Sequence, residues 1–337
     1  MKGVIVRSVV SGDEDDVASI HNVAFGEWVE TLGDEYDYQY ISPRDVAAWI
    51  KERRDRQECL WIAETNDTAV GYVHCSLNDI HSKKNLKELV LVPTSWDMGQ
   101  SKIAVIPRYR RQAIASALVW KCVKHFKRAG ANLALAVAYN DNKAASKLLQ
   151  GLGFVHHERF YHRPYSDKRP WRHDTVYAEL NLSQPVTSPQ RLNLHVTVRC
   201  AREEDAKRVA EIFRKSAPWT PFGPNVSTDQ ILQHYLKGKS HETILVAEYK
   251  GEIAGVMDFN SKNSRLGILG VAPEYRKKGI GYTLFYHLLE HMRRKGLPKA
   301  IADTGIVLSD AIRMYKRFNL KIVRRQYSWI KILNNDS

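Results

Sequence analysis

The stretch "VAPEYRKKGIGYTLF", residues 271–285, recurs in altered form as "VIPRYRRQAIASALV", residues 105–119. Each copy passes from a β-forming residue through a loop with proline into an amphipathic run, which predicts a strand, a tight turn and a helix. The same spacing carries Gly130 onto Gly296 and Ala145 onto Ala311 without a gap. The chain is therefore an internal repeat, but both loop glycines of the second copy are alanines in the first.

The repeat extends over most of the chain. "LWIAETNDTAVGYV" (60–73) resembles "ILVAEYKGEIAGVM" (244–257), and "VRSVVSGDEDDVASI" (6–20) resembles "VRCAREEDAKRVAEI" (198–212). Between the copies, "SQPVTSPQRLN" (183–193) has the composition of a linker. We therefore expect a first domain at 1–182, a linker at 183–194 and a second domain at 195–337. The order of hairpins and crossovers predicts an α/β fold, a mixed and mostly antiparallel sheet with helices on both faces in each domain.

Composition sets broad limits. The 337 residues are 44% hydrophobic and 26% charged, as in ordinary globular proteins. No apolar run approaches a membrane span and the first residues do not resemble a signal peptide, so a cytoplasmic protein is expected. The four cysteines are widely spaced, which suggests neither a disulfide framework nor a metal site. The net charge of +14 indicates affinity for polyanions, and leaves nucleic acid, an acidic protein and a phosphate-rich cofactor open.

The loop of the second copy is suited to an anion. A strand that turns sharply into a helix directs several free N–H groups to one point, and the helix dipole adds positive potential. Glycine lets a phosphate approach the backbone closely. No G-x-x-x-x-G-K-[ST] phosphate loop and no G-x-G-x-x-G dinucleotide motif occurs, so the usual nucleotide sites are not expected.

Val271-x-Pro273-x-x-Arg276-x-x-Gly279-x-Gly281, followed by a helix, a strand and Ala311-x-x-x-Tyr315-x-x-Phe318, resembles the GNAT family of N-acetyltransferases. The first copy is similar to the same family through its own loop, Asn142 and Gly153-Phe154. The resemblance covers nearly the whole chain outside the linker. It implies that each loop binds the pyrophosphate of acetyl-coenzyme A and that the acetyl group lies between two splayed central strands.

The resemblance transfers residue by residue, with departures. It implies that Tyr315 protonates the leaving thiolate, and Asp303 is the carboxylate nearest in sequence to serve as a base. The implied cofactor-binding residues of the second copy are Leu269, Gly270, Val271, Arg276, Lys277, Lys278, Gly279, Ile280 and Gly281. Those of the first copy are Arg110, Arg111, Gln112, Ala113, Ala115 and Asn142. In the first copy, however, Leu149 stands at the tyrosine position, and the Cβ of Ala113 is expected to crowd the pyrophosphate.

The sequence thus predicts an N-acetyltransferase that uses acetyl-coenzyme A without a metal and acts in its second domain. The expected partner is a small-molecule or protein amine, with Trp219 and Phe222 as possible walls of the acceptor pocket, and no membrane. A monomer with a pseudo-dimeric pair of domains, or a homodimer, is expected. A non-catalytic protein that binds coenzyme A or another polyanion stays open, as does an acetyltransferase associated with RNA or the ribosome.

Overall fold

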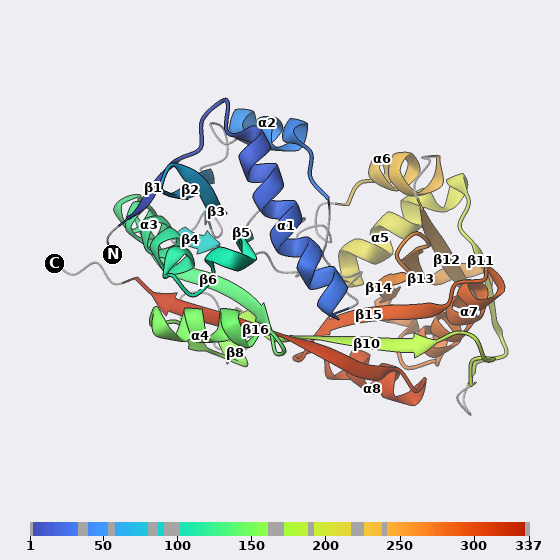
Figure 1. Cartoon of the computed structure of the whole chain (residues 1–337). Helices are drawn as coiled ribbons and strands as arrows, with labels where there is room; N and C mark the ends of the chain where they lie inside the picture. The colour runs from blue at the N-terminus through green and yellow to red at the C-terminus, as the bar shows by residue number, and fades with distance from the viewer. Residues whose placement is uncertain are drawn as a thin grey trace. The chain divides into compact units, whose positions relative to one another are not determined.

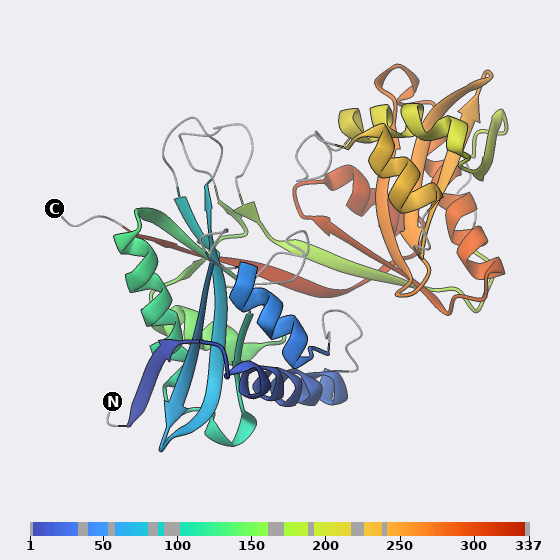
Figure 2. The same ribbon diagram turned by 90° about the horizontal axis from the view of Figure 1, so that it is seen from above.

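The computed structural model of the chain describes residues 3–32, 40–52, 58–79, 87–90, 102–160, 172–187, 192–216, 226–237 and 241–333. The chain forms two units, one of residues 1–174 and 326–337 and the other of residues 175–325. Figures 1 and 2 show each unit as a twisted sheet with helices on both faces. None of the described helices is long and apolar enough to cross a membrane.

The first unit begins with strand β1 and is built around a mixed sheet of order β1-β2-β3-β4-β6-β16, with β5 paired to β3 and β7 to β16. Its elements are β1 (Val4–Ser8), α1 (Glu14–Leu32), α2 (Pro43–Glu52), β2 (Glu58–Thr65), β3 (Thr68–Asp79), β4 (Lys87–Val90), β5 (Lys102–Val105), η1 (Pro107–Tyr109), α3 (Ile114–Arg128), β6 (Ala131–Tyr139), α4 (Lys143–Gly151), β7 (Val155–His156), β8 (Arg159–Phe160) and β9 (Arg172–His173).

The second unit repeats this plan with a sheet of order β10-β15-β14-β13-β12-β11. Its elements are β10 (Thr175–Asn181), β11 (Val196–Cys200), η2 (Glu203–Asp205), α5 (Ala206–Ser216), α6 (Thr228–Gln230), η4 (Ile231–Leu236), β12 (Glu242–Tyr249), β13 (Glu252–Asn260), β14 (Arg265–Val271), η5 (Pro273–Tyr275), α7 (Ile280–Arg294), β15 (Lys299–Gly305), α8 (Ser309–Arg317) and β16 (Lys321–Ile332), of which residues 326–332 belong to the first unit.

Helices cover both faces of each sheet because each sheet has two apolar faces. In the second unit, α7 and α8 pack on one face through a cluster that includes Leu284, Leu288 and Phe318. Helix α5 and η4 cover the other face, in a cluster with Val209 and Ile244. The first unit is arranged likewise, with α3 and α4 on one face and α1 and α2 on the other.

The long helices follow the predicted fourfold spacing. In α7 the residues Ile280, Leu284, Leu288 and Met292 are all buried. The helix ends before Gly296, which has a φ of +77°, a left-handed value that favours glycine. The predicted periodicity and helix end are thus confirmed.

The units differ from the predicted organisation in three segments. Residues 175–181 form β10 and pair with β15 of the second unit, whereas residues 326–332 of β16 pair with β6 of the first. The linker residues 183–194 also belong to the second unit. Local sequence patterns specify that a segment is a strand, but the sheet it joins is set by long-range pairing.

Candidate active site

The two repeated loops have the same backbone conformation. Arg111 and Lys277 each have a φ of +62°, while Ala113 and Gly279 have φ values of +59° and +77° and directly precede α3 and α7. Such angles cost an alanine roughly 1–2 kcal/mol relative to an ordinary conformation. The first copy therefore retains the turn despite its alanine, and each loop leads straight into the N-terminus of a fifteen-residue helix.

The loop arginines differ in their surroundings. The Nε of Arg276 donates to the carbonyl of Val271 at 3.3 Å, and the Nε of Arg110 donates to that of Val105 at 3.1 Å. Arg110 also pairs with Glu27 of α1 at 2.6 Å. Part of the positive charge of the first loop is therefore neutralised within its own unit.

Lys278 of the second loop is close to two aromatic rings. The Nζ of Lys278 lies 5.6 Å from the ring centroid of Tyr249 and 5.2 Å from that of Tyr275. In the first loop, the Nε2 of Gln112 donates to the carbonyl of Arg108 at 3.5 Å. The second loop therefore has more cationic charge beside its amides than the first.

Asn193, in the predicted linker, contacts the second loop. Its Nδ2 donates to the carbonyl of Lys278 at 2.8 Å, and its backbone N–H donates to the Oγ1 of Thr283 at 2.8 Å. Thr283 in turn donates to the carbonyl of Gly279 at 3.2 Å. The hydrogen bonds of Asn193 thus stabilise the loop on the side of its carbonyl groups, and the sequence analysis did not select this residue. The only signal was that "RLN" is polar and close to the second domain.

The strands β14 and β15 are paired at one end only. Among the described residues their parallel ladder consists of the pair Arg265 and Ile301. Ala272 donates to Ala254 on β13, and because hydrogen-bonded pairs alternate in an antiparallel ladder, the N–H groups of Leu269 and Val271 point away from β13. These N–H groups face the β15 side of β14. The resemblance implies that the acetyl group binds there.

Gly270 on β14 and Gly281 on α7 differ in how much space is available for a side chain. A Cβ on Gly270 would lie 2.7 Å from the Oγ of Ser216, so this position requires glycine. A Cβ on Gly281 would have its nearest neighbours at 3.5 Å, an ordinary contact distance. Ala115, the counterpart of Gly281, is therefore sterically compatible with the loop.

Tyr315 reaches from α8 to β15. Its hydroxyl donates to the main-chain carbonyl of Asp303 at 3.2 Å, and its ring stacks on Phe285 with centroids 6.2 Å apart. Burial and, to a smaller extent, the charge of Asp303 raise the pKa of Tyr315. The phenol is therefore protonated at neutral pH and lies beside the strand that faces Leu269 and Val271.

Asp303 is engaged by a cation. Its carboxylate pairs with Arg265 at 2.8 Å, and its side chain is 11% exposed. A carboxylate oxygen that accepts a hydrogen bond from a guanidinium has fewer lone pairs left for a substrate proton. The geometry is thus less suitable for Asp303 as the base than the sequence suggested.

The described part of the first unit differs from this arrangement at the tyrosine position. Leu149 occupies the same place in α4 as Tyr315 in α8 and is buried in the core. The side chain of Asn142 accepts a hydrogen bond of 2.9 Å from the N–H of Ala145 and so caps α4. The first loop thus keeps the shape of the second loop, but a leucine stands where the second unit has its tyrosine.

A buried carboxylate that the sequence analysis missed lies beside β14. Asp258 on β13 is 8% exposed, and its Oδ1 accepts a hydrogen bond of 2.7 Å from the N–H of Ile268. Burial, with the charge of Glu242 adding to it, raises the pKa of Asp258 to about 7. The available signal was an acid within the apolar strand "GVMDFN".

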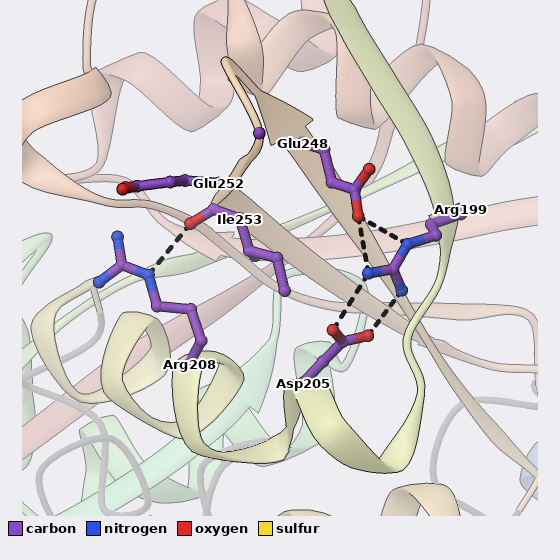
Figure 3. Close-up of a pocket in the computed structure, with 7 residues that line it drawn as sticks. Arg199, Asp205, Arg208, Glu248, Glu252 and Ile253 are labelled. Carbon is purple, nitrogen blue, oxygen red and sulfur yellow. Dashed lines mark hydrogen bonds and ion pairs between the residues drawn. The ribbon is translucent and has the colours of Figure 1, made fainter.

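A surface hollow of about 500 Å³ near β12 and β13 is not part of this arrangement (Figure 3). Within it Arg199 pairs with Asp205 at 2.6 Å and with Glu248 at 2.7 Å. The first unit repeats this network with Arg7, which pairs with Asp13 at 2.7 Å and with Glu64 at 2.6 Å. Since the charges compensate one another at the same place in both units, the network is structural. The predicted pocket walls Trp219 and Phe222 lie outside the described residues.

The sequence is similar to those of known proteins. The Acetyltransferase (GNAT) family matches residues 17–154 and 206–320. An uncharacterized N-acetyltransferase of Methanocaldococcus jannaschii is 24% identical over 163 residues, which cover 47% of this chain and 63% of that relative. The chain thus spans less than two thirds of that curated relative.

Two solved structures are similar over almost the full chain. A tandem GNAT protein from the clavulanic acid biosynthesis pathway has a TM-score of 0.63 at 13% identity, with 99% of this chain and 100% of that chain covered. A GCN5-related N-acetyltransferase from Sphaerobacter thermophilus has a TM-score of 0.58 at 17% identity, with 99% and 97% covered. The predicted tandem fold of mixed, mostly antiparallel sheets is confirmed. With the family matched in both repeats over more than half of its length, the chain belongs to the GNAT family of acetyltransferases.

Proposed function

We propose that the second unit transfers the acetyl group of acetyl-coenzyme A to a primary amine, and that the first unit is a degenerate copy. The proposal is carried by one observation. In the second unit the N–H groups of Leu269 and Val271 on β14 point to the β15 side, where the hydroxyl of Tyr315 on α8 bonds to the main chain of β15. The first unit has Leu149 instead of the tyrosine.

The loop Arg276–Gly281 would hold the pyrophosphate of the co-substrate. Its amides precede α7, and the helix dipole favours an anion there. The clamp by Asn193 keeps the loop ordered before binding, so less entropy is lost on binding. Acetyl-coenzyme A supplies a thioester carbonyl, and the N–H groups of β14 would stabilise the negative charge that develops on its oxygen.

Tyr315 serves as the acid. The amine nitrogen forms a bond to the carbonyl carbon, the carbon–sulfur bond breaks, and the thiolate takes the phenolic proton. The raised pKa of Tyr315 ensures that this proton is present at neutral pH. The attacking nitrogen releases a proton to solvent, and the phenolate regains one from solvent. Each ammonium that reacts therefore yields one amide, one free thiol and one released proton.

Calorimetric titration of coenzyme A tests the location of the site. The wild type is expected to bind one equivalent, and Gly279→Glu to bind none, because a bulky anion would occupy the phosphate position. Gly281→Ala is the matched control, since its Cβ meets only ordinary contacts at 3.5 Å. Binding that survives in Gly279→Glu would place the site elsewhere. Binding without acetyl transfer to any amine would identify a coenzyme A binding protein instead.

A further inference from the structure

The ladder between β13 and β14 is interrupted next to the proposed site. Met257 pairs with Leu269 and Phe259 with Leu266, so the register shifts between them. The shift leaves Asp258 opposite Gly267 and Ile268. There the carboxylate, rather than a main-chain carbonyl, accepts the N–H of Ile268. The interruption therefore places a carboxyl group next to the main chain of β14.

Gly267 makes room for this carboxylate. A Cβ at position 267 would coincide with the Asp258 carboxyl group, so any other residue there would displace it. Gly267 itself is exposed, whereas Asp258 is 92% shielded by the rest of the protein. The buried carboxylate thus lies next to the exposed Gly267, which precedes Leu269 by two residues.

Asp258 and Tyr315 approach β14 from opposite faces of the sheet. Asp258 is two residues from Val256 and pairs with Ile244, both in the cluster under α5. Tyr315 packs against the cluster under α7 and α8. An acetyl group held at the β15 side of β14 would therefore have the acid on one face of the sheet, while the carboxylate lies on the other face, next to Ile268 of the same strand.

The first unit has a different residue at this position. His74 occupies the repeat position of Asp258 and pairs in regular register with Lys102. Its ring lies 5.2 Å from that of Trp49 on α2. The carboxylate, the bulge and the tyrosine thus occur together in the second unit.

We infer that Asp258 is the general base of the second unit, which takes a proton from the ammonium of the acceptor before the amine attacks. This rests on the proposed function. In the step, one N–H bond of the ammonium breaks, the proton bonds to a carboxylate oxygen, and the freed electron pair attacks the thioester carbon. Asp258 later releases the proton to solvent. A carboxylate on the amine side also favours a cationic acceptor over a neutral hydroxyl compound.

The groups that face Asp258 set the pH at which it can act. The negative charge of Glu242 on β12 raises the pKa of Asp258. The charges of both acids also raise the pKa of Tyr235 on η4. The N–H of Ile268 on β14 favours the charged form. Arg265 on β14 is paired with Asp303 on β15 and does not offset Glu242 at Asp258.

The test is a pH profile of kcat/KM, measured with acetyl-coenzyme A and a panel of alkylamines, diamines and peptides with free amino termini. The wild-type rate should rise with a midpoint near pH 7, where Asp258 loses its proton. Asp258→Asn keeps an oxygen for the N–H of Ile268 and should lose about 10²–10⁴ in rate at pH 7. The deficit should shrink toward pH 10, because more of the amine is then neutral in solution.

Two further measurements keep the outcome decisive. Coenzyme A binding by calorimetry shows whether Asp258→Asn is folded. Glu242→Gln leaves Asp258 intact and should move the midpoint to lower pH, since it removes a neighbouring negative charge. Wild-type rate and midpoint in Asp258→Asn, or an unmoved midpoint in Glu242→Gln, would overturn the inference alone. If the wild type acetylates no amine of the panel, the proposed function fails and this inference with it.

Discussion

The side-chain amide of Asn193 donates a hydrogen bond of 2.8 Å to the main-chain carbonyl of Lys278, directly before the N-cap of α7. A linker residue thus holds the back of the phosphate loop while the amide side stays open. Asn193→Ala should weaken coenzyme A binding about three- to tenfold, because one hydrogen bond contributes about 0.5–1.5 kcal/mol and the loop must then be ordered on binding. Calorimetry measures the change.

Asn181→Ala is the matched control for this prediction. Asn181 also bonds to the backbone beside the linker, where it accepts from the N–H of Ser183 at 2.8 Å, but it does not touch the loop. Its affinity for coenzyme A should equal that of the wild type. Equal affinities in both variants would show that the clamp does not order the loop.

Tyr315→Phe should separate catalysis from binding. The ring keeps its stacking on Phe285, and the hydrogen bonds of the hydroxyl to the Asp303 carbonyl and to Thr304 are lost. We expect kcat to fall about 10²–10⁴-fold with the coenzyme A dissociation constant within twofold of the wild type. Tyr275→Phe, whose hydroxyl bonds to Glu252 in the hairpin of β13, should retain the wild-type kcat. A rate loss shared by both variants would argue against a specific proton donor.

Ala113→Gly should relieve strain in the first unit. Ala113 has a φ of +59°, and removal of this strain offsets the greater flexibility of glycine in the unfolded chain, for a net gain of about 0.5–1 kcal/mol in the free energy of unfolding. Ala115→Gly lies inside α3 and should be destabilising by about 0.5–1 kcal/mol. Thermal unfolding distinguishes the two signs. A second coenzyme A site in Ala113→Gly would show that the Ala113 Cβ had blocked the phosphate.

The sequence predicted those features that depend on local chemistry. The tight loop between strand and helix and the fourfold spacing of α7 both follow from residues within one short segment. Asp258 depends on a register shift between two strands, which no spacing in "GVMDFN" reveals. The position of β16 depends on pairing with β6, which is almost two hundred residues away, and local patterns carry no information about such a partner.

Asp174 should stabilise the last strand within the first unit. Its buried carboxylate accepts hydrogen bonds from the N–H of Ser328 at 2.9 Å and from the Nε2 of His156 at 3.0 Å. Asp174→Ala should lower the free energy of unfolding by about 2–3 kcal/mol, since bonds to a charged group are lost and a buried N–H is left without that partner.

Hydrogen exchange in residues 326–332 and along β6 checks where the destabilisation occurs. The matched control is Glu179→Ala, which removes a partly exposed ion pair with Lys299 at 3.4 Å and should cost less than about 1 kcal/mol. Faster exchange confined to other strands would contradict the role of Asp174 as the anchor of β16.

Asp258→Asn should increase stability at the pH where it decreases activity. The pKa of Asp258 is raised in the folded protein from 3.8 to about 7, so the charged form is disfavoured by folding. The stabilising effect of this group is complete below pH 3.8 and is lost as pH rises through 7. An uncharged asparagine avoids that loss, and Asp258→Asn should be more stable than the wild type by roughly 1–3 kcal/mol at pH 8. At pH 4 the two proteins should be nearly equal.

Asp205→Asn provides a control of opposite sign, because Arg199 lowers the pKa of Asp205. The stability that Asp205 contributes is present above its unfolded value near 3.8 and is lost as pH falls, so Asp205→Asn should be less stable than the wild type at pH 8. Chemical denaturation of the three proteins at pH 4 and pH 8 measures both effects. A loss of stability in Asp258→Asn at pH 8 would mean that the Asp258 charge stabilises the fold. The burial that makes the charged carboxylate destabilising is also what raises the pKa of Asp258 toward the value that a general base needs near neutral pH.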